Sequence, residues 1–392
     1  MKIHILGNGI TGQAVQKKVQ ELSDYELADI NNADLIIASP GIHPQNYPKT
    51  NKLIISEIEF AYRLFNRPES KYKPKLIAVT GTNGKTTVTS LIAHILNIPA
   101  TGNIGIPLIT YVDSKIKSEW LAIEVSSYQL EACSTFKPEI AVWLNLTEDH
   151  LLRHNTISQY AEAKAKIFHN QTPDDYVIYP ENDPIICNYI SNIEAKAVSF
   201  SENHPIIHKF NSLQLIGEHN KLNALAAFLA AQITGTPEPE IINKIHSLPP
   251  VEHRIELVRT YQNRSIYNDS KATNPDSTVT AVQAFQKPIN LILCGKDKNL
   301  NLNDFIQFLH QKVKNIVVFG EIKKRFSKLS NALNPEFPLY ESDNMSQALK
   351  KTLTLSQENE VILFSPSCSS FDQFKNFEER GNIFKKKITS LK

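Results

Sequence analysis

Short apolar runs alternate with amphipathic helical patterns along the whole chain. This alternation is typical of βα units, in which strands form a mostly parallel sheet and helices cover its faces. The apolar runs that predict strands are, in chain order, 3–6, 25–28, 35–39, 53–56, 75–79, 121–125, 140–144, 176–179, 266–268, 289–293, 315–319 and 361–365. The pattern therefore predicts an α/β fold.

Two proline-bearing segments divide the predicted strands into three blocks. Residues 66–74 are polar and contain two prolines, which favours a linker. Leu248-Pro249-Pro250 ends the second block, after an Ala-rich helix at about 220–233. A chain of 392 residues is long enough for two or three domains. We therefore expect three α/β domains, at residues 1–73, 74–250 and 251–392.

Composition and charge exclude several classes of function. Lys and Arg number 42 against 40 Asp and Glu, so there is no positive excess that would favour a nucleic-acid partner. No run reaches the roughly 18 apolar residues of a membrane span, and the N-terminal apolar run is too short for a signal peptide. The 4 cysteines are far apart, which argues against a disulfide framework or a structural metal. We therefore expect a cytoplasmic protein without a membrane span.

A glycine-rich loop follows the first predicted strand. Its sequence is Gly7-Asn8-Gly9-Ile10-Thr11-Gly12, and Asp29 lies about 20 residues further on, which matches the dinucleotide-binding fingerprint. Glycines let the backbone approach a diphosphate closely, and the following helix N-terminus supplies N–H donors. The loop therefore predicts a diphosphate site. Another nucleotide diphosphate is favoured over a dinucleotide, and a simple turn is the third alternative.

A second glycine loop follows the strand at 75–79. The segment Thr80–Thr87 (TGTNGKTT) leads into a helix, as in a P-loop, although its first glycine stands two positions later than in the strict motif. Gly84 allows close backbone approach, Lys85 can neutralise a phosphate, and Thr86 can offer its hydroxyl to Mg²⁺. The loop therefore predicts a nucleotide triphosphate site.

Polar side chains follow two of the strands in the central block. Glu124 ends an apolar strand, where a carboxylate is costly unless it is paired or binds a metal. His150 closes the polar segment Asn145–His150 after the strand at 140–144. A glutamate facing water and a surface histidine are the alternatives. Because parallel strands bring their carboxyl ends to one edge, we expect a metal site there.

A predicted helix at about 155–170 carries a lysine on its apolar stripe. Lys164 shares that stripe with Tyr160, Ile167 and Phe168, whereas Lys166 is expected to pair with Glu162 on the opposite face. Two interpretations of Lys164 stay open. Its ammonium snorkels to water, or it has a special role in the site.

Seven segments of the chain resemble the Mur ligases. They are Thr80–Thr87, Glu124–Glu131, Asn145–His150, Gly217–Ala227, His253-Arg254, Asn268–Asn274 and Ser365–Gly381. The P-loop variant alone is shared with folylpolyglutamate synthases. The D-S-K-A-T-N segment and the S-P-x-C-x-S-x-D-Q-F segment are similar to those of the family members that add D-glutamate.

The resemblance implies an ATP-driven amide ligase of peptidoglycan precursor synthesis. ATP would phosphorylate the carboxylate of UDP-N-acetylmuramoyl-L-alanine, and the amine of D-glutamate would attack the acyl phosphate. It also implies a Rossmann-like domain at 1–73 for the UDP-substrate, a P-loop ATPase-like domain with a mostly parallel sheet at 74–250, and a Rossmann-like domain at 251–392 for D-glutamate. We expect a monomer whose partners are these small molecules.

The resemblance also implies a set of site residues. The UDP-substrate would bind Gly7, Gly9, Ile10, Thr11, Gly12, Ser39, Pro40, Gly41 and Asn103. ATP would bind Gly81, Thr82, Asn83, Gly84, Lys85, Thr86, Thr87, Asn220, Asn223, Arg254 and Asp269. D-glutamate would bind Lys271, Thr273, Lys298, Ser370 and Phe377. Two Mg²⁺ sites would use Thr86 with Glu124 and His150 with a carbamylated Lys164, and Lys85, Glu124, His150 and Lys164 would be the catalytic residues.

Three positions depart from the family pattern. Leu152 replaces an aspartate, Cys294 replaces a glycine four residues before Lys298, and the first block is short after Asp29. The alternatives to the leading interpretation are another Mur ligase or a folylpolyglutamate synthase-like ligase, an NAD(P)-binding oxidoreductase built on the first glycine loop, and a P-loop switch that hydrolyses ATP without making a product.

Overall fold

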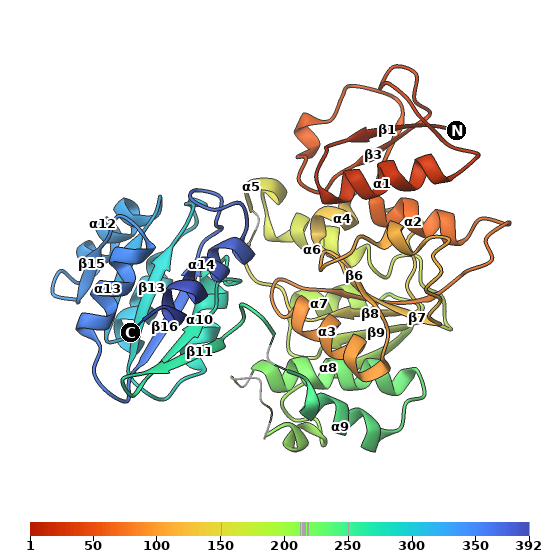
Figure 1. Ribbon diagram of the computed structural model, residues 1–392. Coiled ribbons are helices and arrows are strands. Elements are labelled where there is room, and N and C mark those ends of the chain that lie inside the picture. The colour runs from red at the N-terminus through yellow and green to blue at the C-terminus, as the bar shows by residue number, and fades with distance from the viewer. Residues whose placement is uncertain (150, 212, 214–216, 218, 250, 392) are drawn as a thin grey trace. The chain divides into compact units, whose positions relative to one another are not determined.

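The computed structural model describes residues 1–149, 151–211, 213, 217, 219–249 and 251–391. The chain forms two compact units, Met1–Ser212 with Lys221–Leu248 and Leu213–Asn220 with Pro249–Lys392. The first unit contains a 4-stranded and a 6-stranded sheet, and the second contains another 6-stranded sheet (Figure 1). The predicted α/β fold is therefore confirmed.

The N-terminal sheet is parallel, with strand order β2-β1-β3-β4. Its strands are β1 (Lys2–Leu6), β2 (Glu26–Leu27), β3 (Leu35–Ala38) and β4 (Leu53–Ser56). Its helices are α1 (Ile10–Glu21), η1 (Pro44–Asn46) and α2 (Glu57–Phe65). The helix α1 starts at Ile10, within the segment 7–12, so the first glycine segment forms the turn and the first helical residues of a Rossmann-like unit.

The central sheet is also parallel, with strand order β10-β9-β8-β5-β7-β6. Its strands are β5 (Lys75–Thr80), β6 (Ala100–Gly102), β7 (Trp120–Glu124), β8 (Ile140–Trp143), β9 (Tyr176–Pro180) and β10 (Lys196–Phe200). Its helices are α3 (Lys85–Leu96), η2 (Leu108–Tyr111), α4 (Ser127–Glu131), α5 (Leu151–His154), α6 (Ile157–Ala165), α7 (Pro184–Ile190), η3 (Ile207–Phe210), α8 (His219–Ile233) and α9 (Glu238–Ser247). The strand β5 lies between β7 and β8, so the loop after it is flanked by the carboxyl ends of both.

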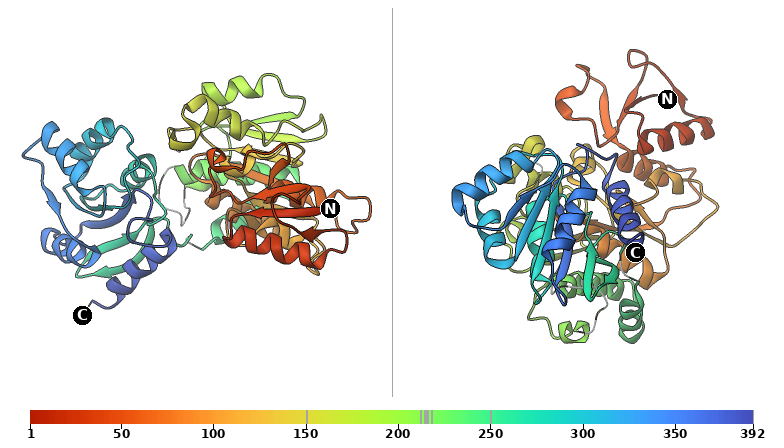
Figure 2. Two further views of the ribbon diagram at one scale, coloured as in Figure 1. Left: turned by 90° about the horizontal axis from the view of Figure 1, so that it is seen from above. Right: turned by 60° about the vertical axis from the view of Figure 1, so that its left-hand side comes forward.

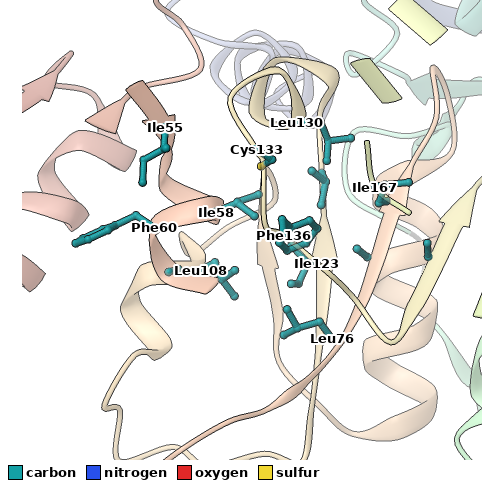
Figure 3. Close-up of a cluster of buried hydrophobic side chains, with 14 of the residues drawn as sticks. Ile55, Ile58, Phe60, Leu76, Leu108, Ile123, Leu130, Cys133, Phe136 and Ile167 are labelled. Carbon is teal, nitrogen blue, oxygen red and sulfur yellow. The ribbon is translucent and has the colours of Figure 1, made fainter. Parts of the chain in front are cut away.

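One hydrophobic core serves the first two sheets. Ile55 and Phe60, from the N-terminal block, belong to the same buried cluster as Leu76, Ile123 and Phe136 from the central block (Figure 3). The fully buried carboxylate of Glu59 on α2 also accepts hydrogen bonds from the backbone of residues 134–136. The two sheets are therefore packed as one unit, and the domain boundary after residue 73 stays a prediction.

The sheet of the second unit has strand order β11-β12-β16-β13-β14-β15, and β11 alone pairs antiparallel. Its strands are β11 (Glu256–Tyr261), β12 (Arg264–Asn268), β13 (Ile289–Cys294), β14 (Asn315–Phe319), β15 (Leu339–Glu341) and β16 (Val361–Ser367). Its helices are α10 (Pro275–Gln283), α11 (Asn303–Lys312), α12 (Lys323–Leu333), α13 (Met345–Leu355) and α14 (Phe377–Thr389).

Alternate residues of these strands enter two separate cores. Leu291 and Leu363 pack with α10, α11 and α12, whereas Ile292 and Phe364 pack with α13 and α14. Helices therefore cover both faces of the sheet, as further views of this unit show (Figure 2). None of the helices in the described part of the chain combines the length and apolar character that crossing a bilayer requires.

A buried carboxylate joins α2 to the central block. Glu57 is fully buried and accepts a hydrogen bond from Ile109 N at 2.6 Å. Burial raises the pKa of Glu57 from 4.5 to about 7, against the effect of that hydrogen bond. The folded protein therefore holds a proton that the unfolded chain releases as pH rises through this range, so the carboxyl lowers the free energy of unfolding progressively with pH.

We expect the free energy of unfolding to fall between about pH 5 and about pH 8 in the wild-type protein. The fall should be about 3 kcal/mol larger than in the Glu57→Gln variant. The amide keeps the shape of the protonated carboxyl but does not ionise. Urea denaturation of both proteins at the two pH values measures the difference. Equal pH dependence in the two proteins would contradict an ionisable role of Glu57.

Candidate active site

The second glycine loop connects β5 to α3 in the predicted order of strand, loop and helix. Gly81 and Gly84 have φ of 150° and 85°, a region that side chains other than glycine avoid. A Cβ atom on Gly84 would lie 2.5 Å from Asn223 Oδ1, so any other residue here would displace the Asn223 side chain of α8. The loop therefore combines a tight glycine turn with an adjacent helix N-terminus, the arrangement that binds phosphates.

Lys85 begins α3 and folds back over the loop. Its Nζ donates to the carbonyl oxygens of Gly81 and Thr82, both at 2.8 Å. This places a positive charge directly beside the backbone that would surround a phosphate. The position suits neutralisation of β- and γ-phosphate charge.

Three of the predicted residues meet at the carboxyl end of β7. Thr86 Oγ1 donates to Glu124 Oε2 at 2.7 Å, and Asn103 Nδ2 donates to Glu124 Oε1 at 2.8 Å. Glu124 is only 2% exposed. A hydroxyl and a carboxylate oxygen form the donor set that Mg²⁺ uses beside a nucleotide, so these residues fit that ion.

Across the described residues, no group of three His, Cys, Asp or Glu side chains is close enough to hold a metal by itself. Mg²⁺ in nucleotide sites usually takes one or two protein ligands and completes its shell with water and phosphate oxygens. The arrangement around Glu124 agrees with this type of site.

Lys164 is buried beside the same loop. Its side chain is 1% exposed, its Nζ donates to Gly81 O at 2.8 Å, and it lies 4.4 Å from the centre of the Tyr160 ring. Burial lowers the pKa of Lys164 well below its usual value, the nearby charge of Lys85 adds to this, and Asp149 opposes it. The predicted stripe of Tyr160, Lys164, Ile167 and Phe168 is buried throughout, so the ammonium does not snorkel to water.

The first glycine loop packs against the segment after β3. Ser39 Oγ donates to Gly7 O at 3.3 Å, and a Cβ on Gly7 would lie 2.9 Å from Ser39 Oγ. A Cβ on Gly12 would lie 2.0 Å from Gly7 O, so α1 approaches the loop as closely as glycine permits. The two predicted parts of the diphosphate site, 7–12 and 39–41, therefore lie side by side.

In the second unit, Asp269 is buried at the end of β12. It accepts hydrogen bonds from Ser365 Oγ at 2.7 Å and from Ile255 N at 3.2 Å. Burial raises the pKa of Asp269 to about 6, and the charge of Arg254 opposes this rise. Arg254 Nε is buried, with no hydrogen-bond acceptor in the described part of the chain. These two predicted residues are therefore electrostatic neighbours.

The residues predicted for D-glutamate lie on loops of the second unit and, for Phe377, at the start of α14. Lys271 Nζ lies 5.1 Å from the centre of the Phe377 ring. The loop that leads to Lys298 pairs with the loop that carries Ser370, because Lys296 N donates to Ser369 O at 2.8 Å. Ser370 is buried and Thr273 is partly buried. A lysine, hydroxyls and an aromatic ring are thus brought together near the carboxyl ends of β12, β13 and β16.

Comparisons with known proteins decide the family. The family model for the Mur ligase middle domain matches residues 79–212, and the model for the Mur ligase glutamate ligase domain matches residues 253–368. The UDP-N-acetylmuramoylalanine--D-glutamate ligase of Caldanaerobacter subterraneus subsp. tengcongensis is 34% identical, over 95% of this chain and 87% of that protein. The chain belongs to the Mur ligase family.

Further comparisons agree with this assignment. The Clostridioides difficile protein with the same enzyme name is 35% identical to this Mur ligase, over 93% of this chain and 86% of that protein. The MurC ligase structure from Thermotoga maritima has a TM-score of 0.64 at 19% identity and covers 100% of both chains. The MurF ligase structure from the same organism, in complex with ADP, has a TM-score of 0.67 at 16% identity and covers 99% of this chain and 95% of that chain. These two likenesses show the fold.

His150 lies outside the described residues, so its predicted role as a metal ligand stays a prediction. The loop before it contains a residue to which the sequence analysis gave no role. Asn145 accepts a hydrogen bond from Asn83 N at 2.8 Å and donates to Asn83 O at 3.1 Å. Its side chain therefore holds the P-loop of this Mur ligase in shape. The sequence feature that could have revealed Asn145 is an amide side chain directly after the predicted apolar strand at 140–144.

The predicted pairing of Lys166 with Glu162 is wrong. Lys166 Nζ donates to the carbonyl oxygen of Glu131 at 2.6 Å. The helix α6 ends at Ala165, so Lys166 is its C-cap and lies outside the regular spacing on which the prediction depended.

Two asparagines of α8 and a cysteine of β13 are further positions singled out from the sequence. Asn220 and Asn223 are buried on α8, and their predicted contacts with ATP stay predictions. The departure at Cys294 is a buried core position of β13, where its side chain packs with Phe319 and Phe364.

Proposed function

We propose that this Mur ligase joins D-glutamate to UDP-N-acetylmuramoyl-L-alanine with the conversion of ATP to ADP and phosphate. The observation that carries the proposal is the identity of 34% and 35% with two enzymes of that name over almost the whole chain. The predicted D-glutamate residues support it, since the loops that bear them lie together in the second unit. The product belongs to peptidoglycan precursor synthesis, in the cytoplasm, and we propose that the enzyme acts as a monomer.

The chemistry divides into an activation step and an amide-forming step. A carboxylate oxygen of the UDP-substrate attacks the γ-phosphorus of ATP, and the bond from that phosphorus to the bridging oxygen of ADP breaks. The amine of D-glutamate then attacks the acyl carbon, inorganic phosphate leaves, and the nitrogen gives up a proton as the amide forms. Negative charge develops on the phosphate oxygens in the first step, and on the acyl oxygen and the departing phosphate in the second, so positioned positive groups are the main requirement.

The central sheet supplies the groups for the activation step. The backbone of residues 81–87 would hold the ATP phosphates, and Lys85 would neutralise their charge. Thr86 and Glu124 would hold one Mg²⁺, while His150 and a carbamylated Lys164 would hold a second. When bound, the ions offset charge on the phosphates and on the attacked carboxylate. Asn103, which fixes Glu124, would also contact the substrate.

The other residues would bind and orient the three substrates. Residues 7–12 and 39–41 would hold the UDP diphosphate. Asn220, Asn223, Arg254 and Asp269 would contact the nucleoside of ATP and its phosphates. The carboxylates of D-glutamate would meet Lys271, Thr273, Lys298, Ser370 and Phe377. This assignment gives a UDP-substrate domain at 1–73, an ATP domain at 74–250 and a D-glutamate domain at 251–392.

Phosphate release with a panel of substrates tests the proposal. We expect release only when UDP-N-acetylmuramoyl-L-alanine, D-glutamate, ATP and Mg²⁺ are all present. Replacing D-glutamate by L-lysine or meso-diaminopimelate should reduce the rate to background, because L-lysine lacks the second carboxylate and both amino acids carry a second ammonium group that the proposed binding lysines would repel. Equal rates with those amino acids would assign the enzyme to another member of the family, and release without any amino acid would indicate an ATP hydrolase.

A further inference from the structure

An arginine of the central block is bonded to the N-terminal block at the proposed diphosphate site. Arg153, on α5, is 9% exposed, and its Nη1 donates to the carbonyl oxygens of Pro40 at 2.9 Å and Ile42 at 3.2 Å. These carbonyls belong to the turn that begins at Ser39, which is bonded to Gly7. Arg153 therefore fixes the backbone of a segment that would hold the UDP diphosphate.

The other side of the guanidinium is anchored in the central block. Arg153 Nε donates to Glu131 Oε2 at 2.8 Å, and Nη2 lies 2.6 Å from the same oxygen. The guanidinium also lies over the Tyr128 ring, at 4.1 Å from its centre. Both partners are on α4, the helix that starts three residues after Glu124. The contacts thus link the turn at 39–42 to the strand end that carries the proposed Mg²⁺ ligand.

Glu131 is itself held by a second side chain. Its Oε1 lies 3.1 Å from His154 Nδ1, and His154 Nε2 lies 2.9 Å from Ser127 Oγ. Burial lowers the pKa of His154 to about 4, with the charge of Arg153 acting in the same direction, so the ring is neutral at pH 7. Nδ1–H then donates to Glu131 and Nε2 accepts from Ser127. Oε1 of Glu131 is thus held by His154, while Oε2 faces Arg153.

The charge and shape of the arginine are both used. A buried guanidinium needs a carboxylate partner, and only a planar group with several N–H donors can reach Glu131 and two backbone carbonyls at once. Burial also raises the pKa of Tyr47, and the positive charge of Arg153 opposes that rise. The electrostatic effect of Arg153 therefore extends to the far end of the 39–47 segment. A lysine at this position could not make the same set of bonds.

We propose that Arg153 is a positioning residue that sets the affinity for the UDP-linked substrate by holding residues 39–42 against the carboxyl end of the central sheet. This inference rests on the proposed function, because it assigns the diphosphate of that substrate to residues 7–12 and 39–41. Arg153 acts through the backbone of the turn and through Glu131. Binding of ATP at the P-loop does not depend on it.

The test compares Arg153→Lys and Glu131→Gln with a matched control. Arg63→Lys alters another arginine of the first unit that pairs with a glutamate, since Arg63 Nε donates to Glu59 Oε1 at 2.8 Å. Within the described residues, Arg63 bonds to Glu59 and Ser134, which both lie outside residues 39–47. We expect both test variants to raise the Kd for UDP and the KM for UDP-N-acetylmuramoyl-L-alanine about ten-fold, with kcat and the KM for ATP within about two-fold. Arg63→Lys should leave all four constants unchanged.

Calorimetric binding of UDP and steady-state kinetics separate the outcomes. If the wild-type protein binds UDP but does not use the muramoyl substrate, the proposed function fails, and the Kd of the variants for UDP still decides the role of Arg153. Unchanged UDP affinity in Arg153→Lys and Glu131→Gln would overturn the inference. An equal rise in the KM for ATP would also overturn it, since that is the result of a general structural role. A wild-type protein without affinity for UDP would overturn both.

Discussion

Replacing Lys85 with alanine is expected to remove ligase turnover and to leave the protein folded. Its ammonium is held beside the P-loop by the carbonyl oxygens of Gly81 and Thr82, and it is placed to neutralise charge on the transferred phosphate. Loss of one such group from a transition state commonly lowers the rate by about a hundred- to a thousand-fold. The side chain is only partly buried, so its removal leaves no large cavity in a core.

Phosphate release and a thermal melt together measure this outcome. Lys17→Ala, which removes an exposed lysine from α1, is the control and should keep wild-type activity. A Lys85→Ala protein that keeps about half of the activity, or one that melts far below the wild type, would contradict the proposed role.

Replacing Lys164 with alanine is expected to be almost as damaging, for a different reason. Burial lowers the pKa of Lys164 and so favours the neutral amine, which can react with CO₂ to give a carbamate and release a proton. The remaining N–H can still donate to Gly81 O, and the new carboxylate supplies a negative ligand on a long arm. A free ammonium at this position would instead repel Mg²⁺. We therefore expect about a hundred-fold loss in Lys164→Ala, with partial recovery when small carboxylic acids fill the space.

Three measurements distinguish the carbamate from an ordinary buried lysine. Labelled bicarbonate should be trapped on Lys164 in the wild-type protein, removal of bicarbonate should lower activity, and formate or acetate should restore part of it in Lys164→Ala. Lys166→Ala is the matched control from the same helix end. It should be close to wild type, because Lys166 Nζ bonds to the carbonyl oxygen of Glu131, whereas Lys164 Nζ bonds to Gly81 of the P-loop. Activity that is insensitive to bicarbonate, without label on Lys164, would leave only a structural role.

The hydrophobic pattern predicted the interior strands better than the edges of the sheets. The runs at 289–293 and 361–365 are fully buried neighbouring strands in the sheet of the second unit, and such runs contain little but apolar residues. The missed strands β6, β10 and β15 lie at sheet edges, where they are short or carry exposed residues. The missed β11 is an antiparallel edge strand, and its mixed pattern resembles a loop.

The candidate site was predictable where chemistry follows a strand directly. Glu124 and Lys85 were found because a carboxylate or a Gly-Lys-Thr segment at a strand end has little use in packing. The side chains that position the loops were not found. Arg153 bonds to Pro40 across 113 residues and Arg380 bonds to Ser270 across 110, and a single sequence contains no signal for such distant pairs.

The common core of the first two sheets has a consequence for synthesis of the protein. Ile55 and Phe60 leave the ribosome early, but the apolar residues that cover them extend to Ala195 in the same cluster. At about 5–20 residues per second, Ala195 follows Ile55 after roughly 7–28 s. During this interval the nascent N-terminal sheet exposes apolar side chains to solvent, and we expect chaperones to bind them. Slower translation or a truncated gene that stops within the central block should therefore favour aggregation over a free N-terminal domain.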